Sequence, residues 1–128
     1  MTSRIAVIAI DALDPPRVAE FWMAVLGWQI VDEEGGVISI GPPDGVGPAI
    51  DVVRVPERKE LKNRLHLDLR ADGSSQDQEV ERLLALGARH ADVGQGPDVS
   101  WVVLADPEGN EFCVLSQPVG IPSPPTGS

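Results

Sequence analysis

Two glycines placed to end helices, Gly27 and Gly87, stand at matching points of a repeated order of segments. Each time, a short strand comes first, then an amphipathic helix closed by the glycine, then three more strands. The two glycines are 60 residues apart. A repeat of this length indicates duplicated modules rather than a solenoid of short repeats. We therefore predict an α+β fold of two βαβββ modules.

The chain has 128 residues, which is the size of one domain. We predict a single domain over residues 1–117, with module one at 1–56, a polar linker at 57–63 and module two at 64–117. Residues 118–128 are rich in Pro, Gly and Ser, and we expect a tail without a core of its own.

The helix of module one carries clear boundary signals. Asp14 is a suitable N-cap, Pro15 suits the first helical position, and Gly27 suits the C-terminal end. Apolar side chains recur between them at the spacing of one helical face, which predicts a core-facing helix. Strands are predicted over residues 4–10, 28–32, 37–40 and 49–55.

Module two opens with strict alternation over residues 64–70. The leucines at 65, 67 and 69 share one face, and His66 and Asp68 lie on the opposite, polar face. Ser75 with Gln78 forms a capping-box signature for the second helix. Strands are predicted over residues 88–93, 99–104 and 111–115.

The last two strands are joined by a dense turn signal over residues 106–110. Its proline fixes φ near the value that a turn requires, and Gly109 and Asn110 are residue types that tolerate positive φ. On the returning strand, Glu111 and Cys113 share the face opposite the apolar one. That face can present chemistry while the other joins a core.

The composition argues against several classes of partner. The formal net charge is −10 at pH 7, whereas binding nucleic acid requires clustered Lys and Arg. The longest apolar run, residues 5–10, is too short for a membrane span or a signal peptide. A single cysteine cannot form an internal disulfide, which fits a reducing compartment. We expect a cytoplasmic protein without nucleic-acid or membrane partners.

Three stretches resemble the vicinal oxygen chelate superfamily, in its glyoxalase-like and bleomycin-resistance-like branch. They are AEFWMAVLGW at residues 19–28 with the Asp-Pro pair before it, KNRLHLDL at 62–69, and DPEGNEFCVL at 106–115. The resemblance implies paired modules that form a curved mixed sheet around a cavity, with the helices outside. It also implies a small-molecule ligand in the cavity between the sheets, and a homodimer.

Metal-using members of this superfamily hold a divalent ion through side chains of both modules. The corresponding positions here are Val7, a residue near Asp51, His66 and Cys113. Val7 has no donor atom, and Cys113 stands where a carboxylate is usual. Catalytic metal sites offer about three protein ligands and an open position. We therefore expect no cofactor and regard a divalent metal as disfavoured.

The polar face suggests catalytic residues. His66 is a candidate general base and Glu111 a second acid or base; the alternatives are a hydrogen-bonded strand histidine and a rim carboxylate. Asp68 lies on the same face as His66 and either orients it or pairs with a neighbouring arginine. We expect Asp68 at the ligand in either case.

Three further residues are expected at the ligand. Trp101 can stack on a flat molecule, and Trp28 either lines the cavity or packs in the core. Cys113 is expected on the cavity face as a small buried residue rather than a nucleophile, because nucleophilic thiols need nearby positive charge.

Three functions remain open on the sequence alone. The first is an enzyme, an isomerase or lyase that moves a proton beside a carbonyl with His66 as base. The second is a non-catalytic binding or drug-sequestration protein. The third is a metal-dependent glyoxalase or dioxygenase. A fold of this kind hosts many activities, so it does not decide among them.

Overall fold

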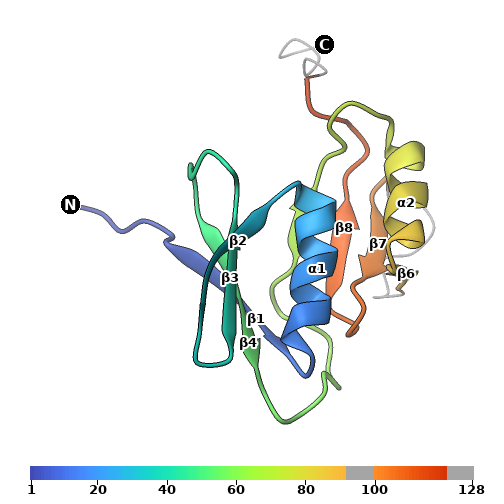
Figure 1. Cartoon of the computed structure of the whole chain (residues 1–128). Coiled ribbons are helices and arrows are strands. Elements are labelled where there is room, and N and C mark those ends of the chain that lie inside the picture. The colour runs from blue at the N-terminus through green and yellow to red at the C-terminus, as the bar shows by residue number, and fades with distance from the viewer. Residues whose placement is uncertain (92–99, 121–128) are drawn as a thin grey trace. The chain divides into compact units, whose positions relative to one another are not determined.

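The structure is a computed structural model that describes residues 1–91 and 100–120 (Figure 1). Its order of elements confirms the predicted duplication, βαβββ twice over, and the α+β class. The elements are β1 (Val7–Ala12), α1 (Pro15–Leu26), β2 (Gln29–Glu34), β3 (Val37–Gly41), β4 (Ala49–Arg54), β5 (Leu67–Leu69), α2 (Gln76–Ala85), β6 (Arg89–His90), β7 (Val102–Ala105) and β8 (Glu111–Val114).

Each repeat carries its own four-stranded mixed sheet. The strand order is β1-β4-β3-β2 in the first sheet and β5-β8-β7-β6 in the second. In each, the first strand of the repeat runs parallel to the last, and the other pairs are antiparallel. The two repeats therefore share one topology.

The chain divides into two compact units. Unit 1 comprises Met1–Leu61 with the turn Asp106–Gly109, and unit 2 comprises Lys62–Ala105 with Asn110–Ser128. The division after Leu61 lies inside the linker predicted at residues 57–63.

The core of unit 1 lies between α1 and its sheet. The side chain of Asp14 accepts the backbone N–H of Arg17 at 3.4 Å, and Gly27 ends the helix at φ 69°. Both termini lie where the capping signals predict them. Four buried aliphatic residues, which pair across β3 and β4, face the helix: Ile38 with Val52 and Ile40 with Ile50.

A buried hydrogen bond fixes the turn of unit 1 to this helix. The indole N–H of Trp22 donates to Oδ2 of Asp106 at 3.1 Å, and both side chains are buried. The other oxygen, Oδ1, accepts the N–H of Glu108 at 2.9 Å. The Glu108 carboxylate in turn accepts the N–H groups of Leu13 and Asp14, each at 2.7 Å. Buried polar groups are paired in this way because an unpaired one costs free energy.

The apolar face of unit 2 is built as the alternation predicts. Phe112 and Val114 of β8 are fully buried, and their partners on β5 are Leu67 and Leu69. The second helix starts with the predicted capping box, in which Ser75 and Gln78 each accept the other's backbone N–H.

One sequence prediction in unit 2 is wrong. Leu65 was placed on the buried face, but it is 89% exposed, and β5 begins only at Leu67. The chain before β5 is tied to side chains at the start of β8 instead of joining the ladder. Of the two turn residues that tolerate positive φ, Gly109 adopts it and Asn110 does not.

Several strand boundaries also differ from prediction. The first strand extends to Ala12 because it stays paired with β4 as far as Arg54. The strands predicted over 88–93 and 99–104 reach partly into residues 92–99, which lie outside the described residues. Most of the predicted tail, 121–128, lies outside them too. None of the described helices has the length and apolar character needed to cross a membrane.

Candidate functional site

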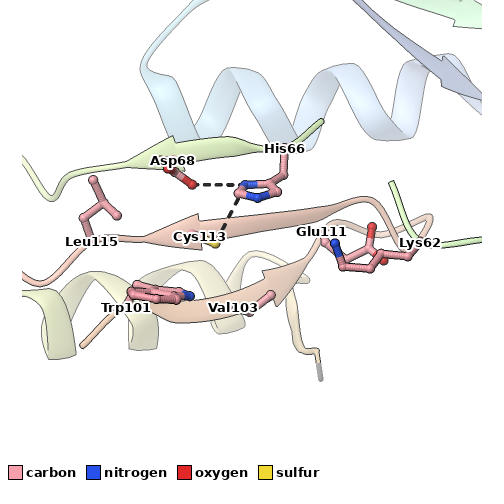
Figure 2. A pocket seen from close by; sticks show the side chains of 8 residues that line it. All are labelled: Lys62, His66, Asp68, Trp101, Val103, Glu111, Cys113 and Leu115. Carbon is pink, nitrogen blue, oxygen red and sulfur yellow. Dashed lines mark hydrogen bonds and ion pairs between the residues drawn. The ribbon is translucent and has the colours of Figure 1, made fainter. Parts of the chain in front are cut away.

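A pocket of about 300 Å³ lies on the sheet face of unit 2 that is opposite Phe112 and Val114 (Figure 2). The residues that line it come from β5, β7, β8 and the chain just outside these strands. They are Lys62, His66, Asp68, Trp101, Val103, Glu111, Cys113 and Leu115.

The structure brings together His66, Asp68, Trp101, Glu111 and Cys113, all of which sequence reasoning placed at the ligand. Trp28 does not line this pocket. It lies in unit 1, half-buried, directly after α1. Its proposed contact with a ligand stays a prediction.

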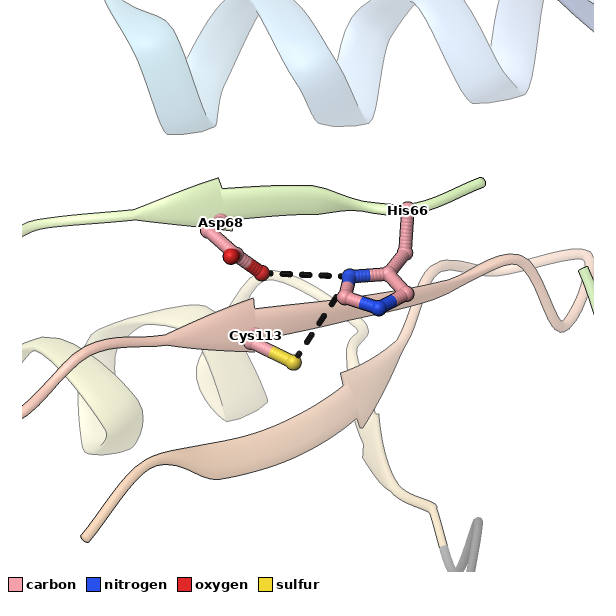
Figure 3. A group of neighbouring side chains, drawn as sticks. All are labelled: His66, Asp68 and Cys113. Atoms are coloured by element: carbon pink, nitrogen blue, oxygen red, sulfur yellow. Dashed lines mark hydrogen bonds and ion pairs between the residues drawn. The ribbon is translucent and has the colours of Figure 1, made fainter. Parts of the chain in front are cut away.

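His66 is held by Asp68 in the wall of the pocket (Figure 3). Nδ1 of the imidazole lies 3.1 Å from Oδ1 of Asp68. A carboxylate only accepts, so Nδ1 carries the proton and Nε2 of the neutral ring keeps its lone pair. The two side chains are 41% and 48% exposed, so the pair adds little to stability. What it fixes is the tautomer and the direction of the ring.

Cys113 forms a neutral part of the pocket floor. The residue is only 5% exposed, and Sγ lies 3.9 Å from Nδ1 of His66. Burial, the negative charge of Asp68 and a hydrogen bond to Asp68 raise the pKa of the thiol to about 11, while the Lys62 charge acts in the opposite direction. The thiol is therefore protonated at neutral pH and is a poor nucleophile.

This state of Cys113 predicts slow alkylation. With the pKa raised from 9.0 to about 11, the thiolate at pH 8 is about 100-fold scarcer than for an ordinary cysteine. Iodoacetamide should therefore modify the native protein at least about 100-fold more slowly than the urea-unfolded chain at the same pH. Equal rates, followed by mass spectrometry, would contradict the buried thiol.

Glu111 has a structural partner as well as a place in the pocket. Its Oε2 accepts the backbone N–H of Asn63 at 3.2 Å, and the Asn63 amide donates to Asn110 at 3.4 Å. Glu111 thus holds the chain before β5 against the start of β8. A second role as acid or base stays a prediction.

Three residues that line the pocket were not predicted there: Lys62, Val103 and Leu115. Lys62, the charged one, lies in the polar linker predicted at residues 57–63. It reaches the pocket because its neighbour Asn63 is anchored to Asn110 and Glu111. The KNRLHLDL stretch that begins at Lys62 is the only local signal that marks it.

Comparison with known proteins assigns the family. The profile of the family described as glyoxalase-like domain matches residues 7–115. The chain belongs to the glyoxalase-like domain family. No curated protein matches it in sequence.

Solved structures share the fold of this glyoxalase-like protein at low sequence identity. A glyoxalase/bleomycin resistance protein/dioxygenase family enzyme from Burkholderia phytofirmans PsJN is 18% identical, with a TM-score of 0.65, over 88% of this chain and 97% of that one. A variant of the fosfomycin resistance protein FosX from Listeria monocytogenes, complexed with Mn(II) and 1S,2S-dihydroxypropylphosphonic acid, is 15% identical, with a TM-score of 0.68, over 93% and 94%. TnmS3, an antibiotic binding protein from Streptomyces sp. CB03234, is 18% identical, with a TM-score of 0.61, over 91% and 97%.

Strand register places Asp51 and Cys113 at corresponding points of the two sheets. Asp51 pairs with Ala9 and Ser39 in the first sheet. Cys113 occupies the same place in the second sheet, between Asp68 and Val103. The Asp51 carboxylate accepts the Ser39 hydroxyl at 2.6 Å.

One group of side chains in the pocket could hold a divalent ion. Donor atoms of His66, Asp68 and Cys113 lie within 4.8 Å of one another, so they could approach one ion. The contact between His66 and Asp68 occupies one donor atom of each, and the Cys113 thiol, whose pKa is raised to about 11, would have to lose its proton to ligate a metal. Val7 offers no donor at the remaining family position.

We therefore predict well under one equivalent of divalent metal in protein purified without chelator. Elemental analysis measures the content, and His66→Ala is the matched variant. Near-stoichiometric zinc, iron, nickel or manganese that His66→Ala abolishes would contradict this prediction and favour the metal-dependent alternative.

Proposed function

We propose that this glyoxalase-like protein binds a small organic molecule in the unit 2 pocket and uses His66 as a general base, without a metal ion. The observation that supports this most is the contact of Nδ1 of His66 with Asp68 at 3.1 Å in the pocket wall. It leaves Nε2 as the basic atom of a positioned imidazole.

The reaction class that suits such a base is proton transfer at a carbon next to a carbonyl. The C–H bond breaks, its proton moves to Nε2, and the electron pair enters the enolate. Asp68 stabilises the imidazolium that forms, because its carboxylate faces Nδ1. Return of the proton to a neighbouring carbon gives an isomerase, and loss of a β-substituent gives a lyase.

The rest of the pocket suits a small, partly apolar molecule. Its volume of about 300 Å³ is at the lower end for ligand sites. Trp101, Val103 and Leu115 supply apolar surface on the same wall. Such a lining holds the ligand, and a few polar groups orient it.

The second candidate is sequestration without chemistry. The Trp101 ring is 39% exposed at the pocket and can stack on a flat ligand. Similarity in fold to an antibiotic binding protein adds weight to this reading. A ligand that binds through Trp101 and undergoes no proton exchange would favour it.

Deuterium exchange tests the proposal directly. A thermal-shift screen of small aldehydes, ketones and 2-keto acids that carry an aromatic ring and a C–H bond next to the carbonyl identifies ligands. Each ligand is then incubated with the protein in D₂O, and loss of its carbonyl-adjacent proton signal is followed by NMR. We expect exchange well above the buffer rate for at least one ligand. Binding with buffer-level exchange throughout the panel would leave sequestration as the function.

Homodimerisation and a cytoplasmic location, which the resemblance and the composition suggest, stay predictions. Light scattering at micromolar concentration checks the first. A monomer mass there would contradict it.

A further inference from the structure

We infer that the ligand of the unit 2 pocket is a small aromatic carboxylate, with its charged end at the Lys62 ammonium and its ring against Trp101. This inference rests on the proposed binding function, but not on whether His66 moves a proton.

Lys62 places an ammonium group at one end of the pocket, beside the Glu111 carboxylate. It lies with Glu111 toward one end of the pocket, and Trp101 and Leu115 lie toward the other (Figure 2). Glu111 and Leu115 are four residues apart along an extended chain, roughly 13 Å at the usual rise. That length is enough for one ring and a short acidic side chain.

The backbone that carries Lys62 is fixed at this end. The N–H of Asn63 bonds to Glu111 and its amide bonds to Asn110, so the residue next to Lys62 is anchored at two points. An ammonium group on a fixed backbone loses less conformational entropy when it binds an anion than one on a mobile backbone does.

The Lys62 ammonium is the group in the pocket lining that suits an anion. Both carboxylates of the pocket have partners, since Asp68 faces His66 and Glu111 accepts from Asn63. Within the described residues, the Lys62 ammonium forms no hydrogen bond or ion pair. Its charge is felt at the pocket floor, where it lowers the pKa of Cys113 against the larger effects that raise it. An entering carboxylate therefore meets a cation that has no competing partner.

The opposite end favours a flat, apolar group. The Trp101 ring is partly exposed, and Val103, Leu115 and the neutral Cys113 thiol supply uncharged surface near it, while the Asp68 carboxylate faces His66. A ring stacked on an indole gains dispersion and quadrupole attraction that a flexible aliphatic acid does not. The chain's net charge of −10 opposes any anion at long range, but salt screens it.

Three ligands of one shape test the charge preference: phenylacetate, phenylacetamide and phenethylammonium. Calorimetry on the full chain measures their affinities at low and high salt. We expect phenylacetate to bind about tenfold more tightly than phenylacetamide, the ratio that one charge-assisted hydrogen bond gives, and phenethylammonium to bind most weakly.

Lys62→Met should remove about tenfold of the phenylacetate affinity and leave phenylacetamide unchanged. Lys59→Met is the matched control, because it deletes the same charge from the same connection but does not line the pocket. The inference is overturned if phenylacetate does not bind at millimolar concentration, if phenethylammonium binds best, or if both variants behave alike. If carboxylates bind through Lys62 but no ligand exchanges deuterium, the inference about the ligand is upheld and the proposed base function of His66 is contradicted.

Discussion

His66→Ala is expected to lower the rate of enzyme-dependent deuterium exchange by about 100-fold or more, the usual contribution of a positioned general base. The imidazole supplies a basic atom in the pocket whose direction is set by a carboxylate, Asp68 at 3.1 Å. Because the side chain is 41% exposed, its removal should leave the fold and the melting temperature nearly unchanged. The exchange rate is measured by NMR on the panel ligand that exchanges fastest.

Two variants separate a base from a mere contact. His90→Ala removes the other histidine, which is exposed on β6 and outside the pocket, and should keep the wild-type rate. Glu111→Gln keeps an oxygen for the N–H of Asn63, so a loss of rate there would reveal an acid–base role. If His66→Ala keeps the wild-type exchange rate and its ligand affinity falls tenfold or less, His66 only contacts the ligand. His66 would then be a hydrogen-bonded strand histidine, and the general-base proposal would be wrong.

Much of the fold was predictable because its determinants are local. The Asp14 cap, the Gly27 stop and the capping box at Ser75 each depend on residues within a few positions, and all three appear as expected. The two-residue period of β8 likewise placed Glu111 and Cys113 on one face without any knowledge of the sheet.

The parts of the site that were missed depend on contacts distant in sequence. Lys62 reaches the pocket, and Leu65 leaves the core, because side chains at the start of β8 hold Asn63. No periodicity within residues 57–66 contains that information. The register of Asp51 could not be predicted either, because the path of the Gly/Pro loop before β4 cannot be followed from the sequence. The structure shows it through the pairing of Asp51 with Ala9 and Ser39.

The largest effect on stability is expected at Trp22. Trp22→Ala should reduce the free energy of unfolding by about 3–5 kcal/mol, the usual cost of removing a buried large aromatic side chain. The residue is 1% exposed, and its ring packs edge-on against Phe21 with centroids 5.2 Å apart. Urea unfolding followed by circular dichroism gives the difference. Trp101→Leu, at a partly exposed ring, should change stability far less.

Trp22→Phe isolates the hydrogen bond from the packing. Phenylalanine fills most of the same space but cannot donate to Oδ2 of Asp106, which is fully buried. We expect a loss of about 1–3 kcal/mol, because the buried carboxylate loses a hydrogen bond that the phenyl ring cannot replace. Stability equal to wild type would show that the bond contributes nothing. The expected loss would instead show that α1 and the turn at residues 106–109 stabilise each other. The indole of Trp22 in α1 donates the hydrogen bond that the Asp106 carboxylate of the turn accepts.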